Sequence, residues 1–251
     1  MQIPYILNKE FSNNVQYSEY SLPSLDDFLI CFWEMRPKTA DSSTVKNIII
    51  ADACIDLVVD FDNKQIGFVG MSKTNFDYEL NTKSRFFGAR MKPGAFYALT
   101  KIPAITAMDG FIAVDAFDGS FDKERFFKLS YDKAKSALTD YLLKLANGKS
   151  PDTYVAFFEN LYESMPANTK EIYNRLNFSA KQCQRLFLKH YGLTPKMTLC
   201  ILRFQKCIGI LTSDNLNRGD YISGYYDQSH FINDFKRYIG ITPSELLEKY
   251  E

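Results

Sequence analysis

The chain contains 251 residues, of which 46% are hydrophobic and 24% are charged, as in an ordinary soluble globular protein. This length suits one large domain or two modest ones. No apolar run approaches the ~20 residues that a membrane helix needs, and the start MQIPYILNKEF lacks the apolar core of a signal peptide. We therefore expect a cytoplasmic protein without a membrane partner.

The net charge of zero conceals an uneven distribution. Residues 165–251 contain 12 lysines and arginines against 8 acidic residues, whereas residues 1–164 contain 18 against 22. The C-terminal part is therefore weakly basic, which alone is a weak sign of nucleic-acid binding.

The cysteines are five in number and form no CxxC pair. An odd count without metal-site spacing favours reduced, mostly buried thiols over disulfides or a zinc site. We expect this for Cys31, Cys54, Cys183, Cys200 and Cys207, and we expect neither a metal nor a cofactor.

Strand patterns extend from about Ile48 to Ala116. One face of IIIADACIDLVVDF is apolar, and the other carries Asp52, Asp56 and Asp60. The segments QIGFVG, SRFFGAR, FYALT and GFIAVDAF follow at short intervals and predict an antiparallel barrel or sandwich. The three aspartates could bind a metal, but a wet sheet face explains them more simply.

The hydrophobic period changes after Phe121. Apolar residues from Phe127 to Leu145 recur in steps of four and three, which predicts one helix about five turns long. We favour packing of this stripe against the β domain over a dimer seam, although three heptads would suffice for a helix pair. A second helix is predicted at Thr153–Glu163, and MPANT (165–169) is the expected linker.

One segment near the C-terminus occurs twice. FSAKQCQRLFLKHYGLTP (178–195) is echoed 48 residues later by YDQSHFINDFKRYIGITP (226–243). Each copy opens with an N-cap residue, Ser179 or Asp227, and closes with Gly and then Thr-Pro, which ends one helix and starts the next. The second exit, starting at Thr242, also has capping-box spacing.

Short helices are expected before the two copies, at Thr169–Asn177 and, more weakly, around Asp220–Tyr225. The result is two helix-turn-helix units. Between them, Pro195 to about Thr212 predicts one helix, roughly 27 Å long at ~1.5 Å per residue. Such a rod could hold two reading helices near the ~34 Å repeat of successive major grooves.

The second helix of each unit has a polar and basic outer face. Gln and Asn can hydrogen-bond adenine, Arg can bind guanine, and Lys and Arg can neutralise phosphates. The candidate DNA-binding residues are Lys181, Gln182, Gln184, Arg185 and Lys189 in the first unit, and Gln228, Ser229, His230, Asn233, Lys236 and Arg237 in the second.

These motifs resemble a known family. GYYDQSHFINDFKRYIGITPSELL is similar to the second helix-turn-helix of the AraC/XylS family of bacterial transcription regulators, whose signature is GF-x-DQSHF-x-x-x-FK-x-x-x-G-x-TP. SAKQCQRLFLKHYGLTP resembles the first unit, so that the resemblance covers about Asn168–Tyr250. In addition, ADACIDLVVDF and FGARMKPGAFYALTKIPAITA resemble the regulatory domain of one AraC-type subgroup.

The resemblance implies an α+β chain: a β-rich, cupin-like regulatory domain and an all-α domain with two helix-turn-helix units on a linker helix. The expected domains are residues 1–120, a helical connector at 121–164 with a dimerisation role left open, and residues 165–251, which should fold alone. The implied partner is double-stranded DNA, read in two adjacent major grooves. The resemblance leaves three further partners open: a small-molecule effector of unknown identity, a second copy of the chain in a homodimer, and RNA polymerase. It also leaves open whether the protein activates or represses transcription.

Five positions depart from the family pattern. In the first unit, Tyr173 stands where two helices usually pack closely, and Asn177 replaces a turn glycine, which Asn tolerates. In the second unit, Gly219 costs about 1 kcal/mol inside a helix, Asp220 replaces a small apolar residue, and Asn233 replaces a common Arg. We therefore expect the second unit to contribute less base-specific binding.

An enzyme and a protein-binding relative are the alternatives. The only histidines are His190 and His230, so the barrel lacks the histidines of a metal-dependent cupin, and none could activate Cys54. Neither G-x-S-x-G, HExxH nor a Gly-rich phosphate loop occurs. We expect no catalytic residues, and we prefer a DNA-binding regulator over a degenerate relative that works through protein–protein contacts, because Arg185 and the Gln-Ser-His run are intact.

Overall fold

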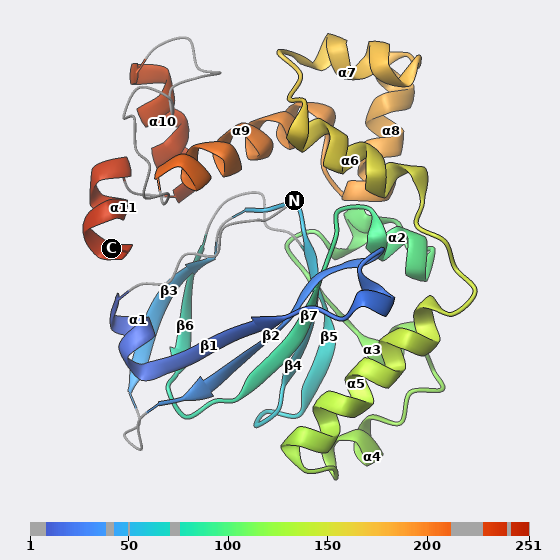
Figure 1. Cartoon of the computed structure of the whole chain (residues 1–251), viewed down its shortest axis with the longest axis vertical. Coiled ribbons are helices and arrows are strands. Elements are labelled where there is room, and N and C mark those ends of the chain that lie inside the picture. Colours follow the sequence, from blue (N-terminus) through green and yellow to red (C-terminus); the bar gives the residue numbers. More distant parts are fainter. Residues whose placement is uncertain are drawn as a thin grey trace.

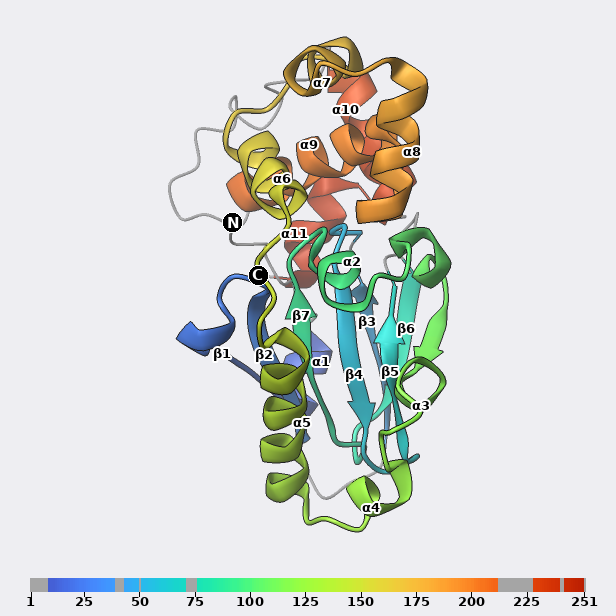
Figure 2. The ribbon, with the colours of Figure 1, turned by 90° about the vertical axis from the view of Figure 1, so that its right-hand side faces the viewer.

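The structure is a computed structural model that describes residues 9–38, 43–49, 51–70, 76–211, 228–239 and 242–250. A sheet-rich N-terminal half is followed by a helical C-terminal half, which lies across one end of the sheet (Figures 1 and 2). None of the described helices is long and apolar enough to cross a membrane.

Six strands form one antiparallel sheet. In spatial order they are β1 (Val15–Tyr20), β2 (Leu29–Pro37), β7 (Phe86–Met91), β4 (Ile55–Asp60), β5 (Gln65–Val69) and β8 (Phe111–Ala113). A separate antiparallel ribbon pairs β3 (Thr44–Ile49) with β6 (Phe76–Asn81). The β-rich N-terminal domain is thus confirmed, although β1 and β2 precede the region where strands are predicted.

The large sheet is covered on both faces. Along β4, Ile55, Leu57 and Val59 are buried and alternate with half-buried side chains. These three belong to a core shared with the helices, whereas the opposite face of the sheet, including Trp33, packs with Leu80 of the ribbon. The sheet therefore separates a helix-side core from a ribbon-side core.

The FYALT segment is a helix, α2 (Ala95–Thr100), and the expected strand is wrong. A six-residue run fits either period, but burial here follows the helical one, with Phe96 and Leu99 both inside the core. Left-handed backbone bounds the helix on both sides, at Gly94 (φ 91°) and Lys101 (φ 62°). A short 3-10 helix, η2 (Ala104–Ala107), follows.

The predicted five-turn helix is broken into two. α4 (Lys123–Phe127) is capped by Asp122, which accepts from the Arg125 amide, and α5 (Tyr131–Ala146) begins after Ser130, whose backbone is extended. The break separates Phe127 from the rest of the stripe. The remaining short elements of this half are α1 (Lys9–Asn14), η1 (Pro23–Leu25) and α3 (Val114–Phe117).

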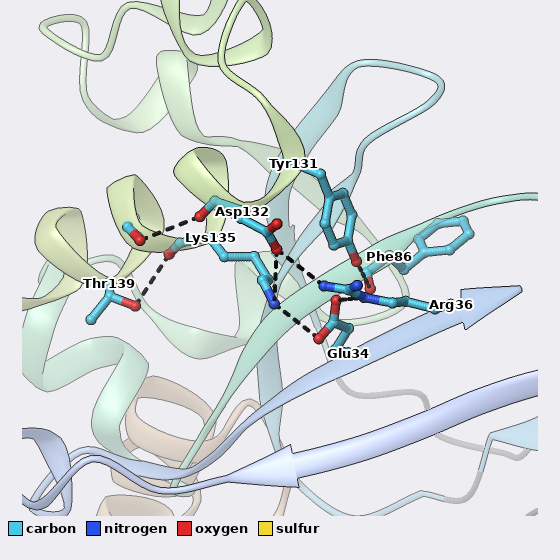
Figure 3. A network of polar contacts seen from close by, with 8 residues as sticks. Glu34, Arg36, Phe86, Tyr131, Asp132, Lys135 and Thr139 are labelled. Carbon is cyan, nitrogen blue, oxygen red and sulfur yellow. Dashed lines mark hydrogen bonds and ion pairs between the residues drawn. The ribbon is translucent and has the colours of Figure 1, made fainter.

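α5 is fastened to the sheet, which agrees with the core-packing interpretation of its stripe. Ala134, Leu138 and Leu142 are buried in the helix-side core. Figure 3 shows Glu34 of β2 between Arg36 and Lys135, with Lys135 Nζ 3.0 Å from its Oε2. Burial would raise the pKa of Glu34, but the hydrogen bonds from both cations hold it below its ordinary value.

Asp52 and Asp56 do not lie on a wet sheet face, so that expectation is wrong. The buried Arg90 of β7 places Nε 3.7 Å from Asp52 Oδ2 and 3.5 Å from Asp56 Oδ1. Trp33 Nε1 also donates to Asp56 at 2.8 Å. Burial raises the pKa of Asp56, although Arg90 opposes this effect. A side-chain cation from a neighbouring strand, rather than solvent, thus accompanies the aspartates.

The C-terminal half is all helical where it is described. Its helices are α6 (Thr153–Glu163), α7 (Thr169–Leu176), α8 (Ala180–Tyr191), α9 (Pro195–Leu211), α10 (Gln228–Ile239) and α11 (Pro243–Tyr250). The helices predicted at 153–163, 169–177 and 195–212 are therefore confirmed within a residue. The weaker helix around 220–225 lies outside the described residues, as do Asp227 and Gly240.

Candidate nucleic-acid interface

The turn of the first helix-turn-helix unit is built as its sequence predicts. α7 ends at Asn177, which adopts the left-handed conformation (φ 53°, ψ 41°) that the usual turn glycine would provide. Ser179 then caps α8 through a capping box with Gln182. α8 ends at Gly192, also left-handed (φ 69°), and Thr194 leads into Pro195 at the start of α9.

The inner face of α8 packs on α6. Phe187 is fully buried, with its ring centroid 6.4 Å from that of Phe157, and the Tyr191 ring lies 5.1 Å from Phe158. The Tyr191 hydroxyl donates to the Tyr154 carbonyl at 2.6 Å. α6, which the sequence assigns to the connector, is thus a supporting helix of the first unit.

The outer face of α8 is exposed where the DNA-binding candidates lie. Lys181, Gln182, Gln184 and Arg185 are all exposed. The Oε1 of Gln182 accepts from the Ser179 amide as part of the cap, so this side chain already has a structural task. Lys189 is half-buried, because its Nζ lies 4.5 Å from the centroid of the Tyr97 ring in α2.

The second unit repeats the arrangement with fewer described side chains. Phe231 and Phe235 are buried on the inner face of α10, and Phe235 contacts Phe204 of α9 with ring centroids 5.4 Å apart. The outward residues Ser229, Asn233 and Lys236 are exposed. The side chains of Gln228, His230 and Arg237 lie outside the description, as do residues 219, 220 and 224 altogether.

The linker helix α9 joins the two units. It has 17 residues, which correspond to roughly 26 Å. Figure 1 shows α8 near one end of α9 and α10 near the other. Thr242 and Glu245 form the predicted capping box at the start of α11, with the Thr242 amide donating to Glu245 Oε2 at 2.6 Å and the Glu245 amide donating to Thr242 Oγ1 at 3.3 Å.

The C-terminal end of α8 contacts the N-terminal half. His190 is buried between two tyrosines: its ring stacks on Tyr154 at 3.8 Å and meets Tyr97 edge-on at 4.7 Å. Its Nδ1 lies 3.5 Å from Asp152 Oδ2. Burial lowers the pKa of His190 to about 4, and Asp152 opposes this only in part. This histidine is therefore a neutral packing residue at neutral pH.

Two further contacts seat the helical half on the sheet, and neither was identified from the sequence. Gly94 leaves room for Tyr191, because a Cβ there would lie 3.3 Å from the tyrosine ring. Gln205 of α9 is buried and donates to the Ala51 carbonyl at 2.8 Å. A buried glutamine in an apolar helix, CILRFQKCIG, is the only sequence signal that could have indicated the second contact.

Comparison with known proteins agrees with this geometry. Residues 172–249 match a family model described as a helix-turn-helix domain, and residues 22–112 match one described as a domain of unknown function, DUF6597. The chain is thus a DNA-binding protein of the helix-turn-helix class. With the DQSHF signature in register, this domain is similar to the DNA-binding domain of the AraC/XylS family of transcription regulators.

Solved structures that are similar to the chain include those of ToxT from Vibrio cholerae. One form at 1.65 Å is 11% identical with a TM-score of 0.40, over 94% of this chain and 99% of that one. ToxT from Vibrio cholerae O395 is 11% identical with a TM-score of 0.40, over 95% of this chain and 98% of that one. Unsaturated fatty acid-bound ToxT from strain SCE256 is 12% identical with a TM-score of 0.40, over 94% of each chain. No curated protein matches the chain.

Proposed function

We propose that this regulator reads two adjacent major grooves of double-stranded DNA, one with α8 and one with α10, under the control of its N-terminal domain. The observation that carries the proposal is the pair of second helices at the two ends of α9 (Figure 1). Each of them buries aromatic side chains inward, Phe187 and Tyr191 in α8 and Phe231 and Phe235 in α10, and exposes polar or basic side chains outward. A linker of roughly 26 Å approaches the ~34 Å repeat of the groove.

The outer residues divide into base readers and phosphate binders by their place on the helix. Arg185 lies in the middle of α8 and is exposed, which suits a bidentate contact to guanine. Lys236 lies farther along α10 and is also exposed, where the DNA backbone is the nearer partner. The two residues therefore have different expected roles.

Spacing between half-sites provides the main test. Footprinting on the upstream region of the gene would first locate the two half-sites. Inserting about 5 base pairs between them would then rotate one half-site relative to the other by about half a helical repeat. We expect this insertion to reduce affinity to that of a single half-site, as measured by gel shift, since rigid α9 cannot follow the rotation. Insertion-independent affinity would overturn two-groove reading, and failure to bind any duplex would overturn the function itself.

Two substitutions test the residue roles. We expect Arg185→Ala to relax base preference at one position at a cost of ~1–3 kcal/mol. Lys236→Ala should instead weaken binding to all sequences and lower the salt slope by about one unit. Equal, sequence-independent losses from both changes would remove Arg185 from the base readers.

Control of DNA binding by the N-terminal domain would act through the contacts of that domain with α8 and α9. α8 rests on α2 through Tyr97 and His190, and α9 rests on the segment after β3 through Gln205. A change in the sheet domain that moves either seat would therefore move a reading helix or the linker. Substitution of Gln205 by Leu, which removes the donor to Ala51, should alter the preferred half-site spacing in the insertion series.

A further inference from the structure

Three lysines from three separate elements gather at the junction of α2 and α8. Lys189 of α8 and Lys101, at the end of α2, both lie over the Tyr97 ring, with Nζ atoms 4.5 and 5.6 Å from its centroid. Lys149, in the loop after α5, donates from Nζ to the Leu99 carbonyl of α2 at 2.5 Å. Lys149 and Lys189 lie 48 and 88 positions after Lys101 in the sequence, and the fold brings the three positive charges together beside α8.

The charges of this lysine cluster are not balanced nearby within the described residues. None of the three lysines forms an ion pair with a described carboxylate, whereas the neighbouring Lys92 is paired with Glu159 at 2.8 Å. Asp152 faces the cluster but forms no ion pair with any of the three lysines; it caps α6 by accepting from the Tyr154 amide at 3.2 Å. Like charges held close together and not paired with an acid favour an anionic partner.

The cluster is accessible and has free donors. Lys101 and Lys149 are exposed, and Lys189 is half-buried. An ammonium group has three donors, so the single bond from Lys149 to Leu99 leaves two for another acceptor. Burial and the nearby Lys101 both lower the pKa of Lys149, so an incoming anion would relieve a repulsion that already exists.

The partner follows from what the cluster adjoins. Lys189 is on the same helix as the exposed Lys181 and Arg185, so the lysine cluster continues the basic reading face of α8 onto the N-terminal half. Figure 2 shows α8 directly above α2 on one side of the molecule. A duplex in contact with α8 presents a line of phosphates, one per about 3.4 Å of helix axis on each strand, that could pass this junction.

We propose that Lys101 and Lys149 bind DNA backbone phosphates beside the first half-site, so that the N-terminal domain forms part of the DNA interface. This inference rests on the proposed function. It assigns no base recognition to the two lysines, because ammonium groups on flexible stems act on phosphates as point charges. Their contribution should therefore be equal for specific and random duplexes.

The test measures affinity against salt concentration for the full-length chain. Lys101→Gln and Lys149→Gln should each weaken binding to the footprinted site and to a random duplex alike, and each should lower the salt slope by about 0.9. Lys101→Arg and Lys149→Arg keep the charge and should keep the slope. The matched control is Lys83→Gln, an exposed lysine at the opposite end of β7 from α2.

Hydroxyl-radical footprinting provides a second readout. The Gln variants should lose protection only on the flank outside the first half-site. An unchanged slope and footprint, with wild-type binding intact and Arg185→Ala still impaired, would overturn the phosphate contacts while leaving the proposed function standing. An effect that appears only when a small anionic effector is added would also overturn them, since it would assign the cluster to that effector. Absence of wild-type binding would instead refute the proposed function.

Discussion

The two helix-turn-helix units share a sequence pattern but are supported differently. α8 of the first unit packs on α6 and on α2, and its Phe187 and Tyr191 belong to the same core as the large sheet. In the second unit, Phe235 packs on Phe204 of α9 and on Phe231 of its own helix. Within the described residues, α7, α8 and α9 contribute to the core shared with the sheet, and α10 does not.

This difference in support determines how directly each unit would respond to a change in the N-terminal domain. A unit that shares its core with the N-terminal domain cannot move without disturbing that domain, since closely packed cores transmit strain. Within the described residues, α10 at the far end of α9 has no part in that core, so rotation of α9 alone would reposition it. If both units read DNA as proposed, the described contacts couple the first of them directly to the N-terminal half.

The largest expected effect concerns a pair of fragments. The shorter fragment, residues 165–251, is the C-terminal domain as proposed from the sequence. The longer one, residues 151–251, adds α6 with its buried Val155, Phe158 and Leu161. Burial of each such side chain stabilises the fold by about 1.5–3 kcal/mol, whereas the free energy of unfolding of a whole domain is only about 5–15 kcal/mol. We therefore expect the longer fragment alone to show a cooperative urea transition in circular dichroism. Equal transitions for both fragments would show that α6 is dispensable.

Matched phenylalanine truncations test the coupling itself. Phe187→Ala and Phe235→Ala each remove a fully buried ring, at a cost of ~3–5 kcal/mol. In hydrogen exchange of the full chain, the first change should increase exchange in α8 and also in α2. The second should increase it in α10 and α11 alone. Local effects from both substitutions would contradict the shared core of the first unit.

A smaller effect is expected from pH. The pKa of His190 is about 4 in the folded chain, below the ~6.5 of an unfolded histidine. As pH falls through 6.5, the unfolded state takes up the proton first, so this contribution to stability is complete above that pH and is lost toward pH 4. Between pH 7 and 5 the loss should be about 2 kcal/mol.

The measurement compares urea unfolding of the wild type and His190→Gln at both pH values. The difference in free energy of unfolding between the wild type and the variant should be about 2 kcal/mol smaller at pH 5 than at pH 7. Titration of the carboxylates changes the stability of both proteins equally and cancels in this difference. A difference that does not vary with pH would mean that His190 is solvated when folded.

Local chemistry explains which parts of this fold could be predicted from sequence. Caps and turns depend on residues a few positions apart, so Ser179, Asn177 and the Thr242 box appear where the repeat placed them. The strand predicted for FYALT is wrong because so short a run fits both periods. Lys101 also ends the helix in a conformation that lysine rarely adopts.

Contacts between distant residues could not be predicted in this way. Arg90 lies 38 positions from Asp52 along the chain, and nothing in the alternating pattern indicates which strand would be its neighbour. Likewise, Tyr97 has no sequence feature that links it to His190. The exposure of the candidate residues on α8 follows from the helical period of their sequence, and their role in DNA binding stays a prediction. The seat of α8 on the N-terminal half instead depends on the complete fold.

The smallest effect sharpens the comparison at the DNA itself. Direct readout requires side chains fixed to a fraction of an ångström, and α8 is held by a capping box, by α6 and by α2. We therefore expect the first half-site to carry most of the base-specific energy. Scrambling it should abolish specific binding, whereas scrambling the second should cost about tenfold, or ~1.4 kcal/mol. Footprinting would locate the half-sites, and gel shifts with each scrambled duplex would measure the losses. Greater sensitivity under α10 would mean that support from the N-terminal half does not determine which unit reads the sequence.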